Sequence, residues 1–350
     1  MVNEAENQVE NNVNTDNIQT LEQEQPKKNF YKSCDLIEHG FMVDNLNYVR
    51  VCSIINDKYD GRPIIFSNYK GELFDKDEFF AIKRKHREMM KNGTPPYECT
   101  NCPMLREDEW DDEDYIDNLL FAHWVACNSN CIYCGATTDE FIAENHTDYN
   151  FYPAIKDLIE RNILIRSAKI DFAGGEPTVY PEFEDLLSLF IEKGFDDIYV
   201  NTSSIKYSPS IYEALKRNKI TLTISVDAGT KEMHQKVKQV PSYDKVWNNI
   251  LKYSEAQQLA ESKEKICLKY IFVPGLNDIK EEIDVFFDKV KDAKIDHVAL
   301  SLDMFWWEKH KHDDNSKLIE LANYFIQKAH DNNYKLNIYP WARWLLGIEQ

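Results

Sequence analysis

Three cysteines stand close together in the middle of the chain. The segment 126–135 reads ACNSNCIYCG, which places Cys127, Cys131 and Cys134 in a C-x3-C-x2-C pattern. Three thiolates at this spacing can ligate three irons of a cubane iron–sulfur cluster and leave the fourth iron open to a cofactor or substrate. A three-thiolate zinc site and unrelated core cysteines are the alternatives. Zinc more often takes pairs of cysteines with a fourth ligand further along the chain.

A second set of four cysteines precedes the triplet. Cys99 and Cys102 form a C-x2-C pair, and Cys34 and Cys52 lie upstream as single residues. Four thiolates are a complete ligand set for zinc or for a [4Fe–4S] cluster, so iron–sulfur, zinc and no metal all remain open. The eighth cysteine, Cys267, has apolar neighbours in the middle of an apolar run, which is typical of a buried hydrophobic residue.

A glycine-rich turn carrying a carboxylate follows the triplet. The segment Gly174-Gly175-Glu176-Pro177 comes directly after an apolar run. Glycines allow the backbone to approach a ligand closely, and a carboxylate pairs with an ammonium group. In isolation this segment would be an ordinary turn.

Regular elements must position these motifs. From residue 118 onward, apolar runs typical of strands alternate with amphipathic helical patterns. This alternation predicts an α/β fold with a parallel sheet covered on both faces. Six units at even spacing favour a partial, open barrel over a complete eight-stranded one, and functional residues then gather at the carboxyl ends of the strands. The predicted strands are 119–126, 168–173, 197–202, 220–226, 266–273 and 296–302, and the predicted helices are 151–162, 182–193, 208–217, 242–257, 279–292 and 315–331.

The triplet with Tyr133 before its third cysteine, on the first loop of a predicted (β/α)6 barrel, resembles the radical S-adenosylmethionine (radical SAM) superfamily. The Gly-Gly-Glu-Pro segment at the end of the second strand resembles that family's second motif. The resemblance implies a [4Fe–4S] cluster on the triplet and S-adenosylmethionine beside it. The residues that the resemblance assigns to this cofactor are Tyr133, Gly174, Gly175, Glu176, Ser225, Asp227 and Val273.

The second cysteine set, with a predicted helix at 75–92 inside it, resembles the auxiliary-cluster module called SPASM or twitch. This resemblance implies a second iron–sulfur cluster on Cys34, Cys52, Cys99 and Cys102. The set departs from the usual placement because it precedes the barrel rather than following it. Relatives with this module often modify peptides, so a peptide substrate is expected first and a sugar or other small metabolite second.

Composition and patterning suggest five segments. We expect a disordered tail over 1–29, a SPASM-like domain over 30–106, and an acidic, solvated linker over 107–117, where eight of eleven residues are acidic. The barrel follows over 118–310, with a helix and strand packing on it over 311–350.

The overall charge excludes some functions. There are 41 basic and 60 acidic side chains, a net charge of −19, which disfavours binding to nucleic acid or to anionic membranes. No apolar run is long enough to span a bilayer, and no secretion signal is visible. A cytoplasmic location is therefore expected, where free thiols and metal sites are more common than disulfides.

The sequence therefore predicts a radical SAM enzyme that cleaves S-adenosylmethionine reductively and takes a hydrogen atom from a substrate. The resemblance implies an electron donor such as flavodoxin or ferredoxin. Asp303, Trp306 and Trp307 follow the sixth strand at the expected barrel mouth, where the tryptophans either pack internally or contact substrate. A non-enzymatic zinc-binding interaction protein is the alternative of another class.

Overall fold

The computed structural model describes residues 28–44, 48–52, 64–66, 69, 71, 73, 75–102, 104–135, 150–260 and 265–348. Most of the expected disordered tail, residues 1–27, lies outside the described residues. The parts of the chain that carry all eight cysteines and the Gly-Gly-Glu-Pro segment are described.

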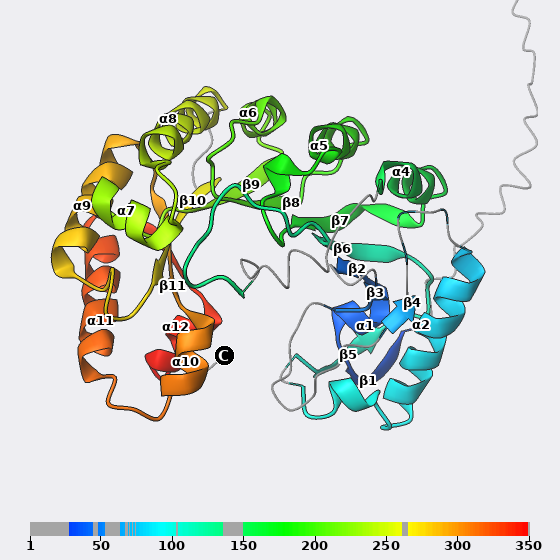
Figure 1. The fold of residues 1–350 in the computed structure, drawn as a ribbon. Coiled ribbons are helices and arrows are strands. Elements are labelled where there is room, and N and C mark those ends of the chain that lie inside the picture. The colour runs from blue at the N-terminus through cyan, green and yellow to red at the C-terminus, as the bar shows by residue number, and fades with distance from the viewer. Residues whose placement is uncertain are drawn as a thin grey trace, which may run out of the picture.

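The six predicted strands form a continuous parallel sheet. Each pairs with the next in chain order, as the prediction of a partial (β/α)6 barrel requires. The sheet curves as an open arc (Figure 1), and no strand pairing closes it in the described part of the chain. The fold-class prediction is confirmed. The strands are β6 (Ile116–Ala122), β7 (Leu164–Phe172), β8 (Ile198–Thr202), β9 (Ile220–Ser225), β10 (Ile266–Phe272) and β11 (His297–Leu302).

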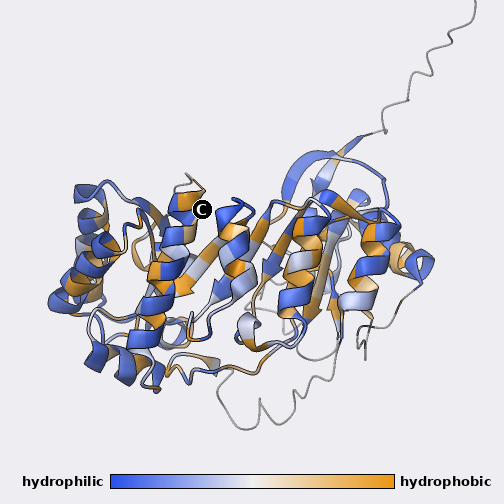
Figure 2. Cartoon of the chain, turned by 90° about the horizontal axis from the view of Figure 1, so that it is seen from above, coloured by the Kyte–Doolittle hydropathy of each residue, from blue (hydrophilic) through white to orange (hydrophobic). Residues whose placement is uncertain are grey.

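The predicted helices cover the outer side of the arc (Figure 1). They form because apolar residues recur on one side of each helix and are buried against the sheet; in α5 these include Leu186, Leu187 and Phe190. Figure 2 shows hydrophobic and hydrophilic residues together on the helices, as this arrangement requires. The helices are α4 (Tyr152–Glu160), α5 (Phe183–Glu192), α6 (Pro209–Lys216), α8 (Tyr243–Leu259), α9 (Lys280–Asp292) and α11 (Ser316–Asp331). An additional helix, α7 (Lys231–Lys238), precedes α8.

The N-terminal region extends the barrel sheet. Strand β2 (Gly40–Asp44) pairs in parallel with β6 through five residue pairs. Strand β3 (Val49–Arg50) then pairs antiparallel with β2, and β4 (Ile64–Phe66) pairs antiparallel with β3. The sequence did not reveal β2, because its five residues are all buried and show no alternation. The other elements of this region are β1 (Asn29–Ser33), α1 (Asp35–His39), α2 (Lys76–Lys91) and the short helix η1 (Tyr97–Cys99).

The acidic segment 107–117 is mostly exposed or half-buried, as expected of a solvated segment, but it is not an irregular linker. Its first residues belong to β5 (Arg106–Trp110), which pairs antiparallel with β1, and its last two begin β6. Its carboxylates pair with cations of α2: Asp112 with Lys91, and Asp114 with Arg84 and Arg87. Local composition misled here because the compensating charges lie in a helix about 25 residues earlier.

The chain ends against the other edge of the arc. Helix α10 (Met304–His310) follows β11 directly, and β12 (Lys335–Ile338) pairs in parallel with β11 before α12 (Pro340–Leu345). None of the helices in the described residues is both long and apolar enough to cross a bilayer.

Candidate active site

One cavity of about 210 Å³ joins the two sequence motifs. It opens at the carboxyl ends of β7 to β10, where a βα barrel places its functional residues. The three cysteines, Gly174, Gly175 and Glu176 all line it, together with Tyr133 and Ser225. The structure therefore brings together eight of the ten predicted site residues outside the second cysteine set.

The loop that carries the cysteines is fastened to the carboxyl end of α7. Asn130 donates its backbone N–H to the carbonyl of Lys238 (3.0 Å), and Ile132 donates to that of Val237 (3.0 Å). The last carbonyls of a helix have no partner within the helix. Helix α7 therefore uses its free carbonyls to fix the backbone between Cys127 and Cys134.

The three thiols surround the cavity. Ser129 Oγ lies 3.2 Å from Cys131 Sγ, within reach of a weak hydrogen bond. Among the described residues, no three Cys, His, Asp or Glu side chains are grouped about a point that one metal ion could fill. In a cubane cluster each cysteine binds a different iron, whereas zinc requires its ligands to converge. Three thiols that line one cavity are a donor set that fits a cubane iron–sulfur cluster.

The two glycines pack against the strand that leads into the cysteine loop. Gly174 has φ +93°, a conformation that favours glycine. A Cβ on Gly175 would lie 2.5 Å from the Ala126 carbonyl oxygen and 2.6 Å from the carbonyl carbon of Val125. The absence of side chains here lets two protein segments approach each other, in addition to any role toward a ligand.

We therefore expect Gly175→Ala to displace the cysteine loop. Overpacking of this kind costs about 1–3 kcal/mol of stability, and anaerobic reconstitution should yield much less bound iron than in the wild type. Gly194→Ala is the control for general destabilisation, because the positive φ of Gly194 (+90°) strains any side chain there but no atom lies within 4 Å of the added methyl. Wild-type iron content in Gly175→Ala would contradict this packing role.

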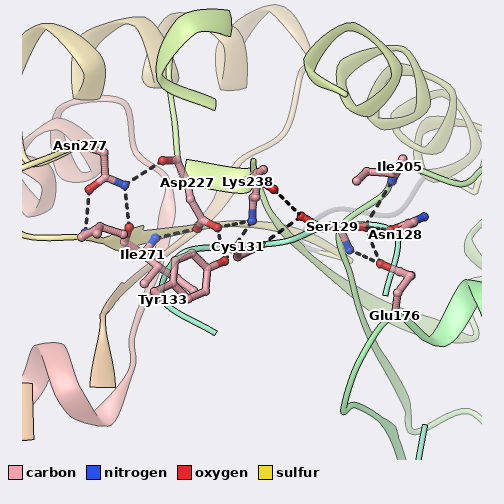
Figure 3. A network of polar contacts seen from close by, with 12 residues as sticks. Asn128, Ser129, Cys131, Tyr133, Glu176, Ile205, Asp227, Lys238, Ile271 and Asn277 are labelled. Carbon is pink, nitrogen blue, oxygen red and sulfur yellow. Dashed lines mark hydrogen bonds and ion pairs between the residues drawn. The ribbon is translucent and has the colours of Figure 1, made fainter. Parts of the chain in front are cut away.

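Glu176 holds the ends of β7 and β8 together. Its Oε1 accepts hydrogen bonds from the backbone N–H and hydroxyl of Thr178 (3.1 and 2.7 Å) and from the hydroxyl of Thr202 (2.6 Å). Its Oε2 accepts from the backbone N–H and hydroxyl of Ser203 (2.7 and 2.6 Å). The residue is 1% exposed. Figure 3 shows it beside the cysteine loop.

Glu176→Gln replaces one carboxylate oxygen by an amide NH2, which cannot accept the hydrogen bonds that backbone N–H groups and hydroxyls donate at this position. We expect the free energy of unfolding to fall by about 1–3 kcal/mol, measured by urea denaturation. Glu213→Gln, at an exposed pair with Lys216, should leave unfolding unchanged. If Glu176→Gln keeps wild-type stability but loses affinity for S-adenosylmethionine, the carboxylate serves the cofactor and not the two strands.

A buried ion pair lies at the cavity wall, with Lys238 lining the cavity and Asp227 behind it. Lys238 and Asp227, 2% and 0% exposed in their side chains, form a salt bridge. The Tyr133 hydroxyl donates to Asp227 Oδ2 (2.6 Å) and accepts from Lys238 Nζ (3.0 Å), so the three side chains form a closed set (Figure 3). Burial alone would lower the pKa of Lys238, but Asp227 outweighs it and raises that pKa. Burial and Asp227 both raise the pKa of Tyr133, which stays a neutral donor.

Asp227 and Val273 do not line this cavity. Asp227 Oδ1 accepts the backbone N–H of Ile271 (2.8 Å), so both of its oxygens already bind protein groups. Asn277 is fully buried and fixes the following turn: its amide donates to the carbonyls of Asp227 and Ile271 and its oxygen accepts from Val273 N–H (2.7 Å). In this structure Asp227 and Val273 therefore support the wall of the cavity and do not form its surface.

Lys238 is a cavity-lining residue that the sequence did not reveal. It lines the cavity and approaches Tyr133 from α7, about 100 residues later in the chain. No motif marks it, and only the folded structure brings it to the cysteines. Conversely, Cys267, which was expected to be a buried hydrophobic residue, is 1% exposed. His123 also belongs to the core: its ring contacts those of Phe151 and Tyr180, and burial lowers its pKa to about 3.

A second, larger cavity of about 650 Å³ adjoins the first. The two share Tyr133, Cys134, Lys269 and Ile271. Asp303 and Phe305 line the second cavity, as do Tyr339 and Trp341 near the C-terminus. Trp306 and Trp307 are not among its lining residues; they pack against the main core. Of the two interpretations of these tryptophans, the geometry favours internal packing.

In the second cysteine set, Cys34 is the N-cap residue of α1. Cys34 and Cys99 are buried, and Cys52 and Cys102 are half-buried. Burial raises the pKa of Cys34 to about 11, and charges at Cys52 and Cys102 add to this shift, so these thiols lie within electrostatic reach of one another.

Comparison with known proteins assigns the central part of the chain. Residues 121–287 match the model of the radical SAM superfamily, so this stretch is a radical SAM domain, and the resemblance expected from the motifs is confirmed. The match begins within β6 and ends in α9, and it includes the cysteine triplet and the Gly-Gly-Glu-Pro segment.

Individual relatives are distant. GTP 3′,8-cyclase of Clostridium botulinum is 24% identical over 170 residues, which are 48% of this chain and 51% of the cyclase. The chain thus spans about half the length of that relative. A 7,8-dihydro-6-hydroxymethylpterin dimethyltransferase of Methanocaldococcus jannaschii is 29% identical over 138 residues, 38% of this chain and 24% of the relative. The crystal structure of Streptococcus suis SuiB bound to S-adenosylmethionine aligns with a TM-score of 0.49 at 16% identity, covering 76% of this chain and 56% of SuiB.

Proposed function

We propose that this protein, with its radical SAM domain at residues 121–287, is an enzyme that cleaves S-adenosylmethionine reductively and removes a hydrogen atom from a substrate. The observation that carries the proposal is the shared cavity: three free thiols and the Gly-Gly-Glu turn line one space at the carboxyl ends of the strands. A second cavity opens beside it, which gives a substrate room next to the cofactor.

Cys127, Cys131 and Cys134 would hold the cluster. When bound, a [4Fe–4S] cluster with an open iron supplies the electron that splits the sulfonium into methionine and a 5′-deoxyadenosyl radical. The chain's own task is to hold the cofactor and exclude water. The loop contacts with α7 fix the thiols, and the Gly174–Glu176 turn and Ser225 offer polar groups to the cofactor.

We propose a second metal centre on Cys34, Cys52, Cys99 and Cys102. What supports it is the donor set: four free thiols in this region suit an iron–sulfur cluster or zinc. An iron–sulfur cluster there would relay electrons or bind substrate. The flavodoxin or ferredoxin donor and the peptide substrate remain predictions from the resemblance.

Anaerobic reconstitution with iron and sulfide tests the proposal. The wild type should gain broad visible absorbance, and S-adenosylmethionine should alter the electron paramagnetic resonance spectrum of the reduced cluster, because the cofactor coordinates the open iron. The triple variant Cys127→Ala/Cys131→Ala/Cys134→Ala separates the two centres: iron that it retains belongs to the second set. Zinc uptake without any visible absorbance would support the non-enzymatic zinc protein and overturn the enzyme.

A further inference from the structure

The second cavity contains one cation with no anionic partner among the described residues. Lys269 lies on β10, at a position that lines both cavities. No carboxylate oxygen of the described residues is within the 4.0 Å ion-pair distance of its Nζ. A half-buried ammonium with no carboxylate in contact, and only the more distant charge of Asp227 to offset burial, is costly, so such lysines are usually paired.

The ammonium is directed toward the second cavity. Its Nζ lies 5.2 Å from the ring centroid of Tyr339, a residue that lines the second cavity but not the first. The aromatic face stabilises the cation, but only in part, because burial still lowers the pKa of Lys269 below its ordinary value.

The other charged residue of this cavity does not neutralise it. Asp303 is the N-cap of α10, and its Oδ1 accepts the backbone N–H groups of Phe305 (2.9 Å) and Trp306 (3.1 Å). The remaining wall is largely apolar and aromatic. A ligand that joins an anionic group to an apolar group would pair with the ammonium of Lys269 and pack against this apolar wall.

We propose that Lys269 binds an anionic group, a carboxylate or phosphate, of the substrate in the second cavity, whose apolar part packs against Phe305, Tyr339 and Trp341. This rests on the proposed function, which makes this cavity the place beside the cofactor where substrate is held. It narrows the substrate class to molecules that join one anion to an apolar or aromatic group, such as an aromatic acid or an acidic peptide segment.

The test uses reconstituted holoenzyme saturated with S-adenosylmethionine and two probes of one skeleton. Saturation-transfer NMR measures the dissociation constants of 3-phenylpropionate and of uncharged 3-phenylpropanol. In the wild type the anion should bind about tenfold tighter or more, as a charge-assisted contact provides. Lys269→Met should lose this preference, and Lys269→Arg should keep it. Lys169→Met is the matched control, since Lys169 is also a strand lysine over a tyrosine ring, 4.8 Å from the centroid of Tyr199, yet lines neither cavity.

Equal binding of both probes by the wild type would overturn the inference without use of any variant. Competition between S-adenosylmethionine and 3-phenylpropionate would also overturn it, because Lys269 would then bind the methionine carboxylate of the cofactor. The proposed function is scored separately, by 5′-deoxyadenosine formation in the same preparation. A wild type that forms none fails as a radical SAM enzyme, whatever the probes do.

Discussion

Replacing Cys127, Cys131 or Cys134 singly by alanine should abolish reductive cleavage of S-adenosylmethionine. Each variant leaves the cluster with two thiolates, and soft thiolate ligands are what hold such clusters. The three positions line one cavity and no other described cysteine lines it, so no neighbour can substitute. The measurement is 5′-deoxyadenosine released under dithionite, quantified by mass spectrometry.

Cys267→Ala is the matched control for these variants. Cys267 is 1% exposed, lies within β10 and lines neither of the two cavities, so it is not placed to bind the cluster. Its loss should affect packing alone and leave cleavage intact. Substantial 5′-deoxyadenosine from any of the three triplet variants would remove the cluster assignment.

Lys238→Met should be the most destabilising single change outside the triplet. It leaves the Asp227 carboxylate buried and without its counter-charge, which costs about 3–5 kcal/mol. The change should also weaken cluster retention, because the Lys238 side chain donates a hydrogen bond to the hydroxyl of Tyr133, the residue that precedes Cys134. Urea denaturation of the unreconstituted protein gives the stability, and bound iron gives the second effect.

Two further variants distinguish charge from size. Adding Asp227→Asn to Lys238→Met removes the unpaired charge and should restore part of the lost stability. Lys231→Met, on the same helix but at an exposed pair with Asp244, should change little. If Lys238→Met unfolds at the wild-type urea concentration, the buried pair does not stabilise this wall of the site.

The central barrel could be predicted because its signals are local. Each strand of the (β/α)6 unit is an apolar run, and each helix has its own apolar side. In the N-terminal region the signals of α2 are local too, since it begins at the capping carboxylate of Asp75 and ends before Gly93. The cysteine triplet and the Gly-Gly-Glu-Pro turn are likewise contiguous in sequence. Their meeting in one cavity follows from the topology, since consecutive parallel strands end at the same edge.

The remainder depends on contacts between distant segments. The role of Lys238 exists only because α7 returns to the cysteine loop, and β2 joins the barrel only because its buried strand pairs with β6. The acidic segment looked like an irregular linker because the basic residues of α2 that neutralise it are remote in sequence. The carboxylate of Glu176 marked it as a candidate site residue in the sequence. Its hydrogen bonds with Thr202 and Ser203 could not be predicted, because they require the ends of β7 and β8 to be adjacent in space.

The most direct test of the central claim is the product assay on the wild type. Reconstituted protein, reduced by dithionite and supplied with S-adenosylmethionine alone, should release 5′-deoxyadenosine and methionine in equal amounts. The amount formed should depend on bound iron and vanish in the triple cysteine variant. Protein that carries a full [4Fe–4S] cluster, binds S-adenosylmethionine and still forms no 5′-deoxyadenosine would contradict the account.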